Sequence, residues 1–150
     1  MEKNEECSKK DLNLLGGTCN KKMTEFVHVS IGELWDKYSI LLIKQNKIVD
    51  EDKLNIVATE IEYLNKAMNK YSYVEHPLFV RLKSINEKLW DIEDNIRVKE
   101  SRKEFDHTFI ELARSVYFTN DERAKCKKEI NTAFGSVIHE VKDYMKYDEV

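Results

Sequence analysis

The stretch PLFVRLKSINEKLWDIEDNI, residues 77–96, carries the clearest helical periodicity in the chain. Its aliphatic side chains alternate steps of four and three residues and so lie along one helix face: Leu78, Leu82, Ile85, Leu89, Ile92 and Ile96. Pro77 suits the first turn of a helix, because its missing N–H would have no helical partner there. The sequence therefore predicts a long amphipathic helix that begins at residue 77.

Similar patterns upstream of this stretch predict a helical hairpin. Ser30-Ile31-Gly32-Glu33 is a capping-box sequence, and the apolar stripe that follows it predicts a helix to about Lys47. Asp50-Glu51-Asp52 then places negative charge where the positive end of a second helix would lie. We expect the two helices to pack as an antiparallel hairpin.

The last third of the chain predicts further helices. Asp106 is the expected N-cap of a fourth helix. Thr119-Asn120-Asp121-Glu122 repeats the capping-box pattern, so this part can form one long helix or two. Gly135 predicts a C-terminal stop, and Ser136 to about Lys146 predicts one last short helix.

The length of 150 residues allows one domain around one core. Residues 1–25 are mostly polar and predict a flexible tail, and residues 26–150 predict a single helical domain. Phe26-Val27-His28-Val29 alternates like a strand, but four residues must pair across a dimer or stay irregular. The predicted fold is all-α, an elongated bundle of a helical hairpin and two long helices, with dimerisation left open.

Composition excludes several classes of partner. Lys and Arg number 25 against 28 Asp and Glu, so the net charge of −3 predicts no nucleic-acid partner. No apolar run approaches the roughly 20 residues of a membrane helix, and the N-terminus lacks the apolar core of a secretion signal. Cys7, Cys19 and Cys126 lie far apart without a CxxC motif, which argues against disulfides and zinc. We expect a cytoplasmic protein without a membrane partner.

Familiar catalytic motifs are missing: the sequence has no Gly-rich phosphate loop, no HExxH and no GxSxG. The sequence therefore assigns no catalytic residue, cofactor or metal, and it leaves open whether the chain is an enzyme. One alternative is a metal-dependent nucleotide pyrophosphatase. It requires the pair Glu33 and Asp36 to face the pair Asp91 and Asp94 across two helices.

Polar residues of the third and fourth predicted helices form the candidate ligand site. Arg114, Tyr117 and Asp121 share one face if the fourth helix is continuous, and Arg114 and Arg123 suit a phosphate or carboxylate. The competing interpretation is a solvated flank held by internal salt bridges. The full candidate set is Asp91, Glu93, Arg97, Arg114, Tyr117, Asn120, Asp121 and Arg123.

Three separated blocks resemble the family catalogued as domain of unknown function 6165. They are SIGELWDK at 30–37, LWDIEDNIR at 89–97, and FIELARSVY at 109–117 with NDER at 120–123 and KEIN at 128–131. The resemblance spans about Val27 to Tyr144 and places the candidate set in the shared pattern. Family members occur in bacteria, phages and large DNA viruses, and some accompany or are fused to glycosyltransferases. The resemblance therefore implies a glycan-assembly context, without an established mechanism or catalytic residues.

Two functions are compatible with these patterns. The first is a docking or oligomerisation module whose partner is a second copy or a larger protein. It predicts an exposed apolar face that involves Trp35, Trp90 or Phe79, which lie off the regular stripes. The alternative is a small enzyme or binding protein for an anionic metabolite such as a nucleotide sugar, held by Arg114 and Arg123. It requires the arginines of the candidate set to converge.

Overall fold

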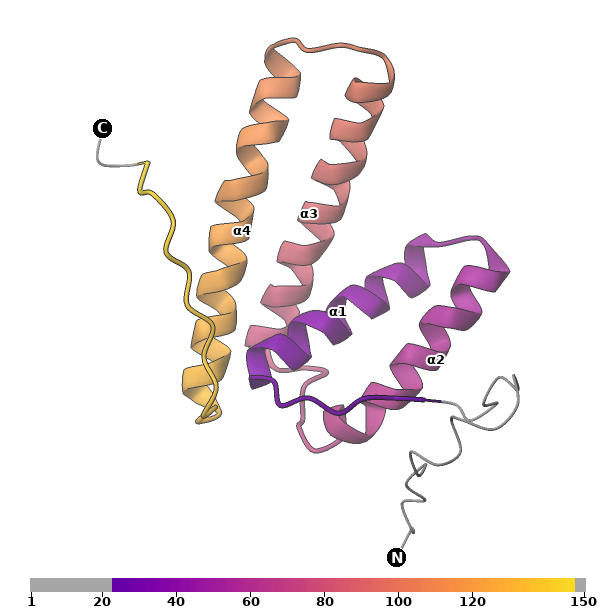
Figure 1. Cartoon of the computed structure of the whole chain (residues 1–150), viewed down its shortest axis with the longest axis vertical. Coiled ribbons are helices and arrows are strands. Elements are labelled where there is room, and N and C mark those ends of the chain that lie inside the picture. The colour runs from indigo at the N-terminus through magenta and orange to yellow at the C-terminus, as the bar shows by residue number, and fades with distance from the viewer. Residues whose placement is uncertain (1–22, 148–150) are drawn as a thin grey trace, which may run out of the picture.

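A computed structural model describes residues 23–147, and this part of the chain is helical and contains no strand. The helices are α1 (Ile31–Lys47), α2 (Glu51–Met68), α3 (Pro77–Ser101) and α4 (His107–Ala133). They form two hairpins, α1–α2 and α3–α4, and α1 lies against α3 and α4 (Figure 1). The all-α fold class is confirmed. Most of the predicted tail, residues 1–22, lies outside the described residues.

Side-chain caps set the predicted helix starts. Ser30 Oγ accepts the Glu33 N–H at 3.1 Å, and Asp50 Oδ1 accepts the Lys53 N–H at 2.9 Å. Asp106 Oδ1 accepts the Phe109 N–H at 3.0 Å. Each bond satisfies a donor in the first turn, where the helix offers no carbonyl partner. The first and fourth helices therefore begin directly after the predicted caps, and the second begins after Asp50, the first residue of the predicted acidic start.

Helix α4 is continuous from His107 to Ala133, which settles the choice between one helix and two. Thr119, where a second helix start was possible, is buried within α4. The helix stops two residues before Gly135, whose φ of 63° suits a residue without a Cβ. The Ser136 N–H then donates to the Asn131 carbonyl at 2.8 Å, as in a Schellman motif.

The predicted short helix from Ser136 to Lys146 is wrong. Residues 136–147, here called the C-terminal segment, form an irregular extended chain that runs back along α4 (Figure 1). Ser136 Oγ accepts the Ile31 N–H at 3.3 Å, and Val137 and Val141 are exposed. The apolar spacing of this segment fits a helix, but the extended chain instead brings the Tyr147 ring against Tyr117 and Phe118 of α4. Residues 26–29 also stay irregular, one of the two outcomes that the sequence allowed.

An aromatic core lies where the two hairpins meet. Trp35 is 0% exposed and meets the rings of His76, Phe79 and Phe134 edge-on, at centroid distances of 5.3, 5.6 and 4.9 Å. The prediction that Trp35 and Phe79 lie on an exposed face is wrong, because both rings are buried in this core. Trp90, the third residue of that prediction, is partly exposed.

Gly32 brings the first turn of α1 against α4. Its N–H donates to Asn131 Oδ1 at 2.7 Å, and a Cβ built on Gly32 would lie 2.7 Å from the Lys127 carbonyl oxygen. No other amino acid fits without displacing backbone, so this contact fixes how closely α1 approaches α4.

In the part of the chain that the structure describes, no helix is long and apolar enough to cross a membrane.

Candidate functional site

A buried lysine lies where α1, α4 and the C-terminal segment meet. The Lys127 side chain is 10% exposed, and its Nζ lies 2.6 Å from Glu33 Oε2, 3.4 Å from Asp36 Oδ2 and 3.2 Å from Glu140 Oε2. Burial disfavours the ammonium, but the carboxylates outweigh burial and raise the pKa of Lys127 above its usual value. Lys127 is therefore a charged structural tie between three segments.

Hydrogen bonds extend this cluster to α3. Asn86 Nδ2 donates to Asp36 Oδ1 at 2.7 Å and to Ser39 Oγ at 2.8 Å. All three side chains are buried, and Asp36 also faces Lys127. A buried polar chain thus connects α3, α1 and α4. Such networks constrain geometry strongly, since breaking one bond leaves a buried group unsatisfied.

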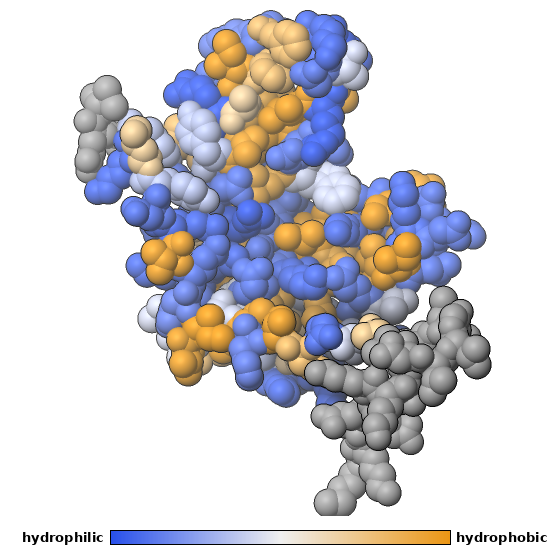
Figure 2. All heavy atoms as spheres, in the orientation of Figure 1, coloured by the Kyte–Doolittle hydropathy of each residue, from blue (hydrophilic) through white to orange (hydrophobic). Residues whose placement is uncertain are grey.

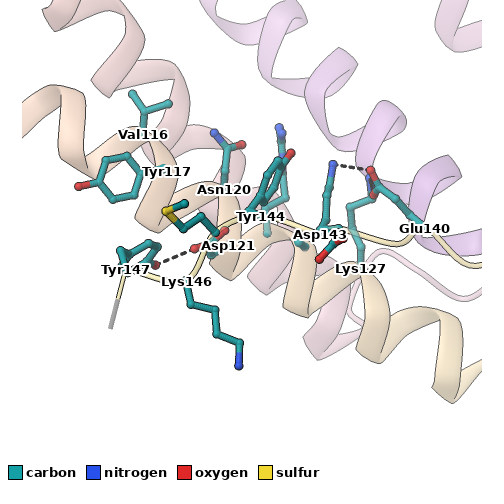
Figure 3. A pocket seen from close by; sticks show the side chains of 14 residues that line it. Val116, Tyr117, Asn120, Asp121, Lys127, Glu140, Asp143, Tyr144, Lys146 and Tyr147 are labelled. Carbon is teal, nitrogen blue, oxygen red and sulfur yellow. Dashed lines mark hydrogen bonds and ion pairs between the residues drawn. The ribbon is translucent and has the colours of Figure 1, made fainter. Parts of the chain in front are cut away.

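Two hollows flank the buried polar chain. The α1–α3 hollow has a volume of about 450 Å³ and contains Ile40, Ile43, Asn86, Leu89, Trp90, Glu93, Asp94, Arg97 and Arg123 in its wall. The α4 hollow, about 900 Å³, lies between α4 and the C-terminal segment (Figure 3). Its wall includes Tyr117, Asn120, Asp121, Arg123 and Tyr144. Figure 3 shows Glu140 near Lys127 and, at the other end of the segment, Tyr147 joined to Asp121.

Arg123 borders both hollows and is the most unusual cation of the site. It is partly buried, yet within the described residues no hydrogen bond or ion pair holds its guanidinium. By contrast, Arg81 binds Glu129 at 2.5 Å and Arg114 binds Glu111 at 3.0 Å. An arginine that is half withdrawn from water without an acceptor favours an external anion.

Comparison with known protein families gives a match. Residues 25–147 match domain of unknown function 6165, a family whose function is unknown. The chain belongs to this family. No curated protein and no solved structure matches the chain. The match includes all four helices and the C-terminal segment, so the Lys127 cluster and both hollows lie within the family domain.

The hollows bring together six of the eight candidate residues in this family domain. Glu93, Arg97 and Arg123 line the α1–α3 hollow. The α4 hollow is lined by Tyr117, Asn120, Asp121 and Arg123. Two of the three arginines in the candidate set, Arg97 and Arg123, therefore line the same hollow, and Arg114 does not.

Asp91 and Arg114 line neither hollow. Asp91 Oδ1 accepts from Lys47 Nζ at 3.0 Å, and Arg114 pairs with Glu111 and lies 5.9 Å from the centre of the Phe118 ring. Both side chains have local partners on the surface, as the salt-bridge interpretation expected. The predicted pairing of Arg114 with Arg123 around one anion is therefore not formed in the structure.

The arrangement needed for a metal-dependent pyrophosphatase is also not formed. Glu33 and Asp36 both face Lys127, whereas Asp91 pairs with Lys47 at the far end of α1. Within residues 23–147, no group of three or more His, Cys, Asp or Glu side chains is placed to hold a metal ion. The two acidic pairs thus contact different lysines and do not face each other.

Sequence reasoning did not single out Trp90, Asn86 or Lys127 for the site. Lys127 lies in a short basic run, Lys125-Cys126-Lys127-Lys128, of a kind that is typical of a solvated helix face. A usable signal existed, because Asn120, Arg123, Lys127 and Asn131 recur at steps of three and four residues. A polar stripe at this spacing on an otherwise amphipathic helix indicates that polar groups face a neighbouring element.

Proposed function

We propose that this family member is a cytoplasmic oligomerisation module in glycan assembly, and that a second copy of the chain docks on the end of the α3–α4 hairpin. This end, residues 98–118, is here called the hairpin tip. The last buried residue of α3 is Ile92 and the first of α4 is Thr119, so every residue of the tip is at least partly exposed. This break in burial is the observation that carries the proposal.

The tip exposes apolar side chains that a two-helix unit cannot cover. Val98, Phe105 and Ile110 are 45%, 57% and 51% exposed. Figure 1 shows the upper ends of α3 and α4 standing clear of α1 and α2, and Figure 2 shows hydrophobic residues gathered over that end. Nearer the core, where α1 covers the hairpin, Leu82 and Leu89 are buried. Exposed apolar side chains that gather in one place are typical of protein interfaces.

The charges of the tip favour a second copy as the occupant. The tip contains four basic residues, Lys99, Arg102, Lys103 and Arg114, and four acidic ones, Glu100, Glu104, Asp106 and Glu111. Each acid pairs with a lysine or arginine of the same tip. A highly charged partner would find no net charge to attract it, and two tips would not repel each other. Two hairpins packed about a two-fold axis make a four-helix bundle.

The glycan-assembly context and the cytoplasmic location in this proposal rest on observations other than the hairpin tip. The glycan-assembly context rests on what the resemblance implies about the proteins that accompany this family. The cytoplasmic setting rests on the spacing of the cysteines, of which Cys126 is a buried free thiol.

Light scattering of the full chain and of charged tip variants tests the proposal. The wild-type chain is expected to have twice the mass of one chain, and Phe105→Asp with Ile110→Asp is expected to give a monomer with unchanged helical circular dichroism. Val80→Asp is the matched control, because Val80 is exposed on α3 outside the tip. A monomeric wild type at micromolar concentration contradicts the proposal, and so does dissociation caused equally by Val80→Asp.

A further inference from the structure

We infer that the α1–α3 hollow binds a phosphorylated sugar, with Arg123 and Arg97 on the phosphate and Trp90 against the sugar ring. The volume of about 450 Å³ falls within the usual range of small-molecule sites, roughly 300–1,000 Å³. This inference does not depend on self-association, since the hollow is formed within one chain.

The two arginines reach the hollow from different helices, Arg123 from α4 and Arg97 from α3. Arg123 has no acceptor among the described residues. Arg97 binds Glu93 through Nη1 alone, at 2.7 Å to Oε2 and 3.0 Å to the carbonyl oxygen, which leaves Nε and Nη2 for another acceptor. Paired guanidinium groups match the oxygens of a phosphate in geometry and charge.

The rest of the wall suits a sugar. Trp90 is partly exposed and lines the hollow together with Ile40, Ile43 and Leu89, so that part of the wall is apolar. An aromatic face of this kind packs against the C–H face of a sugar ring. Glu93 and Asp94 line the same hollow and supply carboxylate acceptors for hydroxyl groups. Two carboxylates beside two arginines disfavour a bare polyanion and favour an anion that carries several hydroxyls.

The α4 hollow is a weaker candidate for the same ligand. Its Lys127 is held by three carboxylates, and its Lys142 forms an ion pair with Glu140. A ligand phosphate there would have to displace these internal partners. The α1–α3 hollow requires no such exchange at Arg123.

Acrylamide quenching of tryptophan fluorescence provides the test on the full chain. The only tryptophans are Trp35, which is 0% exposed, and Trp90, so quenching reports mainly on Trp90. The probes are the 1-phosphates of glucose, galactose and N-acetylglucosamine, with the unphosphorylated sugars and inorganic phosphate as comparisons. At least one sugar phosphate is expected to protect Trp90, and Trp90→Phe is expected to remove the response while the Trp35 emission stays.

Two charge-removing variants of α4 locate the phosphate. Arg123→Gln is expected to weaken binding roughly ten-fold or more, because it removes charge-assisted hydrogen bonds. Lys125→Gln removes one positive charge from the same helix, outside both hollows and outside the hairpin tip, and is expected to leave the affinity unchanged. Circular dichroism verifies that both variants are folded. The inference is overturned if no sugar phosphate protects Trp90, if inorganic phosphate protects it equally, or if the two variants weaken binding alike.

Discussion

At the scale of single residues, Lys127 determines how α1, α4 and the C-terminal segment are held together. Its ammonium is nearly enclosed, and it faces Asp36, whose side chain is equally withdrawn from water. A buried pair adds little net stability, but loss of one partner leaves an uncompensated charge. The cluster therefore specifies how the three segments are arranged, because its charges are paired only when the segments occupy these positions.

Replacement of this lysine tests the role of the cluster. Lys127→Met is expected to lower the free energy of unfolding by about 3 kcal/mol, because Asp36 would remain buried next to an apolar side chain. Urea denaturation followed by circular dichroism measures the change. The neighbouring Lys128 is exposed, so Lys128→Met is the control and is expected to change stability by less than about 0.5 kcal/mol. Equal effects of the two substitutions would show that Lys127 has no special structural role.

At the scale of secondary-structure elements, α1 organises the molecule. It is the one described helix that packs against all three others, and its first turn meets α4 through Gly32. Glycine ordinarily weakens a helix, by about 1 kcal/mol relative to alanine. Here the missing Cβ allows the backbone contact with α4, so the close approach outweighs helix propensity.

This balance predicts the sign of one substitution. Gly32→Ala is expected to destabilise the protein by about 1–3 kcal/mol, because the added methyl group would meet the Lys127 carbonyl oxygen at 2.7 Å. Thermal unfolding monitored by circular dichroism measures the effect. Stabilisation by Gly32→Ala would mean that the approach of α1 to α4 is looser than described.

Local signals made the helices predictable. Ser30, Asp50 and Asp106 mark helix starts because a cap needs only the next three residues, and the structure confirms each one. The C-terminal segment could not be predicted this way. The spacing of Val137 and Val141 fits a helix, and only the tertiary arrangement shows that no surface covers them.

The candidate site was predictable in part for the same reason. The pair Glu93 and Arg97 follows from spacing within one helix, and Arg123 was identified by its charge and position. Trp90 and Lys127 acquire their surroundings only when α1 crosses α3 and α4. Spacing along one helix does not reveal such a crossing, so these two residues were missed.

At the scale of the whole molecule, the α3–α4 hairpin has a part with buried residues and a tip without any. Around α1 the helices enclose an aromatic core with Trp35 at its centre. Residues 98–118 of the α3–α4 hairpin include no buried residue, and the side chains of Val98, Phe105 and Ile110 face water. This exposed tip is the feature that supports the proposed docking of a second copy.

Amide hydrogen exchange measured across a range of protein concentrations tests this central claim most directly, because it requires no substitution and reports on each segment separately. Self-association through the tip predicts that exchange in residues 98–118 slows as concentration rises, while exchange in the exposed outer face of α2 stays constant. Exchange in the tip that does not depend on concentration, or slowing confined to α2, would contradict the account.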